Sequence, residues 1–91
     1  MKLPFNPKTV AQRGERIYRE RYRSKYERRY RGKFVAIDVD TKAAHLSESP
    51  EVALADARAQ NPDGLFHLIR VGSLGAFRLS YTSNANLDWL L

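Results

Sequence analysis

The stretch that decides the fold runs from Arg13 to Lys33 and reads RGERIYRERYRSKYERRYRGK. It contains ten Lys and Arg residues and three Glu, whereas the other residues are nearly balanced in charge. The net charge of +6 is therefore concentrated in one segment. A segment this basic, aromatic and regular is expected to form a binding surface on one face of the molecule.

The signals for a helix begin before this stretch and end inside it. Asn6-Pro7 is a typical helix start, because Asn accepts hydrogen bonds from the first free amides and Pro suits the first helical position. Gly32 suits the left-handed turn that ends many helices. We therefore predict one helix from Asn6 to about Arg31, with Gly14 as the candidate position of a bend. At about 37 Å it would exceed the small domain beside it, so it must either overhang or break.

Four tyrosines recur at every fourth position of the predicted helix, at residues 18, 22, 26 and 30. Each four-residue step advances by about 40° around the helix, so the four rings sweep through about 120°. The second half of the helix has no aliphatic residue of its own to bury. Three interpretations stay open. The tyrosines pack on the chain's own sheet, they face a protein partner together with Arg, or they stack on unpaired bases while Arg binds phosphates.

Beyond the helix, the sequence predicts two strand–turn–strand units with a second helix between them. KFVAIDVD alternates apolar and polar residues as a strand does, and Ser49-Pro50-Glu51 repeats the combination of cap, proline and early acid. This order predicts an α+β fold, α-β-β-α-β-β, with a mainly antiparallel four-stranded sheet. The predicted strands cover residues 33–40, 43–46, 65–71 and 76–81, and the second helix covers residues 49–60.

We expect one domain over residues 1–81, with the helix at about 6–31 and the core at about 33–81, followed by a tail over residues 82–91. The tail ends in LDWLL, which either folds back onto the domain or is offered to another molecule. The residues that we predict to contact a partner are Tyr18, Arg19, Tyr22, Arg23, Tyr26, Arg29, Tyr30 and Trp89.

Composition narrows the chemistry. The chain has no cysteine, which excludes disulfides, thiolate metal sites and a cysteine nucleophile, and no apolar run is long enough to span a membrane. We expect a soluble cytoplasmic protein. His45 and His67 have no partner at a metal-ligand spacing, and Asp38 and Asp40 are interpreted as residues of a turn at a strand end. We therefore expect no catalytic set, no cofactor, no metal and no enzymatic activity.

Three short segments carry a resemblance to a known family. They read GKFVAID from Gly32, SPEVALADA from Ser49 and FHLIRVG from Phe66. The chain from about Tyr30 to Leu79 resembles a family of small prokaryotic proteins that share a G-K-[aromatic]-V-A-I strand, an E-x-A-L-x-x-A helix and a strand ending near V-G. The resemblance implies a compact α+β module and a non-enzymatic accessory role beside the product of a neighbouring gene, as antitoxins have. The basic helix lies outside the shared pattern.

These observations favour a non-catalytic interaction module that presents its Arg/Tyr helix to a protein partner or to a second copy. The alternative is a protein that binds RNA or single-stranded nucleic acid with the same helix. An enzyme is the third and least favoured class.

Overall fold

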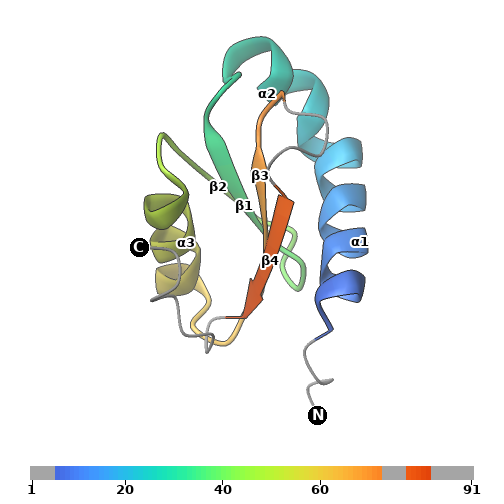
Figure 1. Cartoon of the computed structure of the whole chain (residues 1–91), viewed down its shortest axis with the longest axis vertical. Coiled ribbons are helices and arrows are strands. Elements are labelled where there is room, and N and C mark those ends of the chain that lie inside the picture. Colours follow the sequence, from blue (N-terminus) through green and yellow to red (C-terminus); the bar gives the residue numbers. More distant parts are fainter. Residues whose placement is uncertain (1–5, 73–77, 83–91) are drawn as a thin grey trace.

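The computed structural model describes residues 6–72 and 78–82. Within them a long helix, two strands, a second helix and two further strands follow one another along the chain (Figure 1). The elements are α1 (Pro7–Ile17), η1 (Tyr18–Tyr22), α2 (Arg23–Arg29), β1 (Phe34–Asp38), β2 (Ala44–Ser47), α3 (Pro50–Gln60), β3 (Leu65–Arg70) and β4 (Arg78–Thr82).

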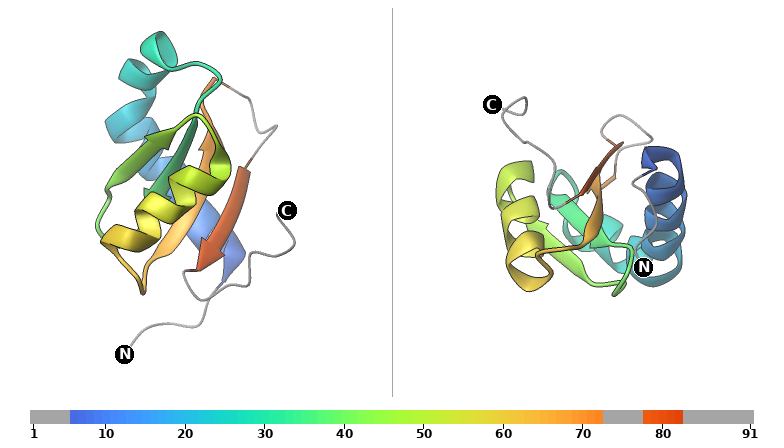
Figure 2. Two further views of the ribbon diagram at one scale, coloured as in Figure 1. Left: turned by 90° about the vertical axis from the view of Figure 1, so that its left-hand side faces the viewer. Right: turned by 90° about the horizontal axis from the view of Figure 1, so that it is seen from below.

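The strands form one sheet in the order β2-β1-β3-β4, and every neighbouring pair is antiparallel. Helix α1 covers one face of this sheet and α3 covers the other, so the domain has three layers (Figure 2). The predicted α+β class, with its N-terminal helix, antiparallel sheet and second helix, is confirmed.

The long helix begins as the sequence predicts and then breaks. The Asn6 side chain accepts hydrogen bonds from the amides of Lys8 and Thr9 at 3.0 and 3.4 Å. At Tyr18 the helix widens into η1, a π-helical turn in which the Arg23 amide donates to the Tyr18 carbonyl five residues earlier. Tyr22 then leaves helical geometry, with φ −124° and ψ −29°. The direction therefore changes at η1, and the bend expected at Gly14 is wrong because α1 stays regular through that residue.

The end of the long helix is tied to the sheet. Its last residue is Arg29, two residues before the predicted end, and Tyr30 is the C-cap. Gly32 has φ +87°, as expected for a left-handed turn, and its amide donates to the Val71 carbonyl at 3.0 Å. Helix α2 therefore turns across the end of the sheet where β1 begins (Figure 1).

The alternation along the strands divides the core between the two faces. Toward α1, the sheet presents Val and Ile side chains, which pack with Val10 and Ile17 of the helix. Toward α3, it presents Phe66 and Leu68, which pack against the helix's Ala53 and Leu54. Antiparallel pairing aligns these sets, since neighbouring residues on paired strands point to the same face.

Helix α3 is capped as predicted, because the Ser49 hydroxyl accepts from the Val52 amide at 3.2 Å. The face of this helix toward the sheet is built from small side chains, which let the helix approach closely. Together with Leu54, its fully buried members are Ala53 and Ala57.

Candidate functional site

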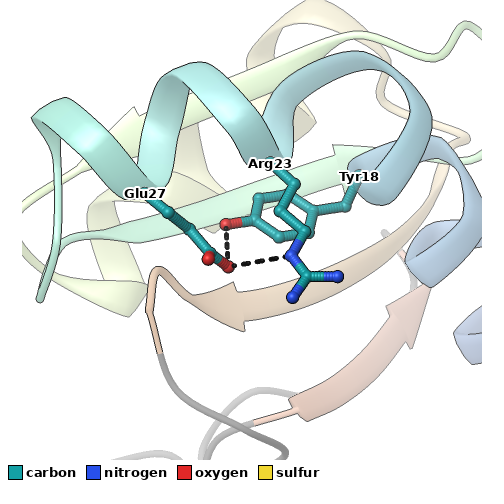
Figure 3. Close-up of polar contacts among 3 residues, drawn as sticks. All are labelled: Tyr18, Arg23 and Glu27. Carbon is teal, nitrogen blue, oxygen red and sulfur yellow. Dashed lines mark hydrogen bonds and ion pairs between the residues drawn. The ribbon is translucent and has the colours of Figure 1, made fainter.

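Tyr18, the first of the predicted partner-facing residues, belongs to the chain's own core. Only 2% of its surface is exposed. Its hydroxyl donates to Glu27 Oε2 at 3.4 Å, and the same oxygen lies 3.5 Å from Arg23 Nε (Figure 3). A buried phenol needs a partner for its polar tip, and Glu27 supplies one. The expectation that Tyr18 faces a partner is therefore wrong, because its ring fills the space between η1 and the sheet.

The other three tyrosines form a ladder of rings along η1 and α2. The ring centroids of Tyr22 and Tyr26 are 5.3 Å apart, and those of Tyr26 and Tyr30 are 5.4 Å apart in an edge-to-face arrangement. Tyr22 and Tyr26 pack against the core on the α1 face, while the Lys33 ammonium lies 5.7 Å from the Tyr30 ring centroid. All three are half-buried, so only part of each ring reaches solvent.

The π-helical turn helps to keep this ladder on the inner side. In a straight α-helix, residues four apart drift by about 40° per step. Because η1 closes its turn over five residues rather than four, Tyr22 is brought back toward the side that Tyr18 occupies. Burial raises the pKa of the Tyr26 phenol above its usual value of 10.0, and the phenols of Tyr22 and Tyr30 raise it further.

The cationic side chains of the long helix point away from the core. Among the predicted contact residues, Arg19, Arg23 and Arg29 are exposed. Within the described part of the chain, Arg23 is the one cation of this helix that forms an ion pair with a carboxylate. The full set of exposed cations in the stretch is Arg13, Arg16, Arg19, Arg21, Arg23, Lys25, Arg28, Arg29 and Arg31.

Two of the three glutamates in the stretch are engaged by internal contacts. Glu27 holds Tyr18 and Arg23, and Glu15 Oε2 lies 2.7 Å from the buried His67 Nε2 of β3. Glu20 is the one acid of the stretch that is classed as exposed. The other two carboxylates lie beside the core, and Glu27 also pairs with Arg23.

A surface hollow of about 270 Å³ lies where α1 and η1 meet the turn after β1. Its apolar residues are Ile17 and Val39, which are 7% and 6% exposed. Four cations and one acid complete the lining, and none of the four cations forms an ion pair within residues 6–72. We call this feature the cationic hollow; the charged residues that line it are Arg13, Arg16, Glu20, Arg21 and Lys42.

The turn that carries Lys42 is held by several hydrogen bonds. Asp38 is buried, and its carboxylate accepts from the amides of Asp40 and Thr41 and from Asn61 Nδ2, at 2.9, 3.1 and 2.8 Å. The interpretation of Asp38 as a turn residue is confirmed. Lys42 has φ +68°, and its carbonyl accepts from the Tyr22 hydroxyl at 2.6 Å. The rim of the hollow is therefore fixed from both the sheet and the helix.

The two histidines lie on different strands of the sheet. His67 is 1% exposed and pairs with Glu15, while His45 is half-buried on β2. Among the residues that the structure describes, no three His, Asp or Glu side chains come close enough together to hold a metal ion. The described helices include none that is long and apolar enough to cross a membrane.

Sequence reasoning missed the cationic hollow. Arg13, Arg16 and Arg21 lie in the basic stretch, but their convergence with Lys42 depends on a turn that follows them by about twenty residues. The one local signal is the i, i+3 spacing of Arg13 and Arg16 beside Ile17, which places them on adjoining sides of one helical face. The predicted contact residue Trp89 lies outside the described residues.

No protein-family model matches the chain, and no curated protein or solved structure matches it.

Proposed function

We propose that the chain is a non-catalytic binding module whose long basic helix contacts the phosphate backbone of RNA or single-stranded DNA. We take the α-β-β-α-β-β order with a four-stranded, mainly antiparallel sheet as the frame of this module. The observation that carries the proposal is the outer side of the helix, where nine exposed Lys and Arg side chains gather and only Arg23 is ion-paired within the described residues.

Electrostatics explains why these cations favour a polyanion. Exposed like charges along one helix repel one another, and neighbouring acids on the same helix would relieve that repulsion. Here Glu27 pairs with Arg23 alone and Glu15 contacts His67 instead, so eight of the nine exposed cations of the stretch form no ion pair within the described residues. A strand of phosphates supplies the missing negative charge and releases its condensed counterions when Lys and Arg replace them.

The placement of the tyrosines also bears on the choice between the two binding hypotheses. A protein interface built on Tyr and Arg needs the rings in contact with the partner. Tyr18 is buried, and Tyr22 and Tyr26 pack on the core, so the freely exposed material of the helix is mainly arginine. Arginine presents a planar fork of donors that matches the oxygens of a phosphate group.

Fluorescence anisotropy with a labelled mixed-sequence RNA tests the proposal. We expect binding at about 50 mM salt, and log K should fall by about 0.7 per contacted phosphate for each decade of salt. The double variant Arg19→Gln/Arg29→Gln should lower this slope by about 1.4, because two phosphates would no longer be neutralised by arginine. Single-stranded DNA and duplex DNA of the same length show which form of nucleic acid is preferred.

Arg58→Gln/Arg70→Gln provides the matched control, since it removes the same charge from α3 and β3. The control should bind with nearly the wild-type slope. No binding of any nucleic acid at low salt would overturn the proposal, and an equal loss in both double variants would show that only total charge matters.

A second candidate is a protein partner, either a second copy or the product of a neighbouring gene as in an antitoxin-like pair. One observation favours it: the half-buried rings of Tyr22, Tyr26 and Tyr30 leave part of their surface in solvent beside arginines. Absolute mass in solution after nuclease treatment, together with co-expression beside the neighbouring gene, tests this candidate. A monomer with no co-purifying chain would exclude it.

A further inference from the structure

The cationic hollow differs from the rest of the basic helix because its charges converge from two separate parts of the chain. Arg13, Arg16 and Arg21 come from α1 and η1, and Lys42 comes from the turn after β1. Elsewhere on the helix the exposed cations come from one element and follow one another along it. A convergent set can surround a single anionic group, whereas a spread set can only follow an extended one.

The fold brings these like charges together without neutralising them. Four cations face one carboxylate, that of Glu20, and no ion pair within the described residues involves any of the four. Like charges that line one hollow repel one another, and the repulsion is stronger beside a protein surface than in bulk water. An arrangement that only stabilised the fold would avoid this repulsion. A bound anion would convert it into attraction.

The geometry of Lys42 is the second observation. A non-glycine residue in the left-handed region is uncommon, and such strain is often found at functional sites. Here the strained residue is held by two contacts. Its amide donates to the Asp38 carbonyl at 2.7 Å, and the Tyr22 hydroxyl donates to its carbonyl at 2.6 Å. The turn and the π-helical segment are thus joined at the rim of the hollow.

The third observation is the size and floor of the hollow. At about 270 Å³ it lies just below the range of about 300–1,000 Å³ that encloses small-molecule ligands. Ile17 and Val39 give it an apolar floor, which strengthens the attraction between charged groups above it. This size suits one compact anionic group, held by the forked donors of arginine and the point charge of lysine.

The geometry points to the cationic hollow as a binding site for one phosphate group, with Arg13, Arg16, Arg21 and Lys42 as its ligands. This inference rests on the proposed function in taking that phosphate to be part of a nucleic acid strand. A free nucleotide carries the same chemistry, and the experiment separates these two sources. Glu20 is the opposing charge at the rim and limits how tightly the anion is held.

Amide chemical shifts of the full chain, followed during titration at constant ionic strength, test the site. The probes are inorganic pyrophosphate, adenosine 5′-monophosphate and a short single-stranded RNA. We expect the nucleotide to shift the amides of residues 13–21 and 39–43. Arg16→Gln and Lys42→Asn should each weaken nucleotide binding about tenfold, the contribution of one hydrogen bond to a charged group. Asn tolerates the left-handed conformation, so the second variant keeps the turn.

Two further variants distinguish a built site from diffuse charge. Glu20→Gln should tighten nucleotide binding several-fold, which a purely structural role for this residue would not cause. Arg29→Gln removes a cation from α2, outside the hollow, and should leave nucleotide binding within twofold of wild type while still weakening RNA binding.

The outcomes separate the hollow from the proposed function. If the nucleotide binds in the hollow but RNA does not bind, the site is upheld for a free phosphorylated ligand and the nucleic-acid function fails. If RNA binds but Arg16→Gln, Lys42→Asn and Arg29→Gln weaken it equally, the nucleic-acid function stands and the hollow is overturned as a specific site. Absence of localised shifts with all three probes also overturns it.

Discussion

The two helical layers cover opposite faces of one sheet but differ in what they leave on their outer sides. Helix α3 buries Ala53, Leu54 and Ala57, and its charged residues are few and of both signs. The long helix buries Val10, Ile17 and Tyr18 in the same way, yet its outer side carries nine exposed cations. Both helices therefore pack on the sheet through buried apolar side chains. Packing on the sheet does not require the exposed positive charge of the long helix, so we look for its role in binding.

The largest expected loss of stability comes from truncating the buried side chain that anchors each helical layer to the sheet. Tyr18→Ala should lower the free energy of unfolding by about 3–5 kcal/mol, and Leu54→Ala by about 2–5 kcal/mol, because each leaves a cavity in a closed core. Tyr30→Ala should cost about 1 kcal/mol, since its ring is half-exposed and contacts Tyr26 edge-on. Urea unfolding measures all three variants. Equal losses at Tyr18 and Tyr30 would contradict the division of the tyrosines into buried and surface rings.

The next effect tests how closely α1 approaches the sheet. A Cβ added at Gly14 would lie 2.3 Å from His67 Cβ, so Gly14→Ala should force α1 away from β3 and cost about 1–3 kcal/mol. Helix propensity alone would predict that Gly14→Ala raises the free energy of unfolding, because Ala favours a helix over Gly by about 1 kcal/mol. Ser24→Ala, an exposed change in α2, is the control and should stay within about 0.5 kcal/mol. A stabilised Gly14→Ala variant would show that the layers are not in close contact there.

A smaller effect tests whether both layers start from equivalent caps. Asn6→Ala and Ser49→Ala should each cost about 1 kcal/mol, because each removes a side-chain acceptor from the first free amides of its helix. The Gly variants at the same positions should cost only a few tenths of a kcal/mol. Thermal unfolding measures the four variants. An effect at Ser49 with none at Asn6 would mean that α1 begins later in solution.

The smallest effect concerns pH and the tyrosine ladder of the long helix. Because the folded state raises the pKa of Tyr26, it holds the phenolic proton more tightly than the unfolded chain does. The contribution of this phenol to the free energy of unfolding is complete below pH 10 and is lost as the pH rises through the higher pKa of the folded state. Between about pH 9 and pH 11, wild type should therefore lose more stability than Tyr26→Phe. Identical pH dependence of the two proteins would show that Tyr26 is not perturbed in solution.

The sequence predicts the parts of this fold that depend on local chemistry. Asn6-Pro7 and Ser49-Pro50 were interpreted as helix starts because a cap and its first amides are neighbours in the chain, and both were confirmed. The left-handed turn at Gly32 follows from the absence of a side chain there. The alternation of KFVAIDVD likewise predicts β1.

The sequence does not predict the features that depend on contacts between distant residues. Tyr18 and Tyr30 occupy equivalent positions in the repeat, yet the sheet covers only the first of them. The wide turn at η1 has no recognisable local signature. Lys42 has a left-handed backbone in a turn that is closed locally by the Asp38 carbonyl, but its second contact, from the Tyr22 hydroxyl, comes from twenty residues away and cannot be inferred from its neighbours in the chain. The candidate site therefore emerges only when the helix and the turn are seen together.

The π-helical turn also has a consequence for how this chain can change in length. The segment holds one residue more than an α-helical turn needs, so the helix before it and the helix after it are out of phase by that residue. Deleting one residue between Tyr18 and Tyr22 would replace the wide turn by an ordinary α-helical turn. Because four residues would then close the turn that five close now, Tyr26 and Tyr30 would stay near the side that they occupy. The wide turn can therefore take up or lose one residue without changing which side chains the second half of the helix turns toward the sheet.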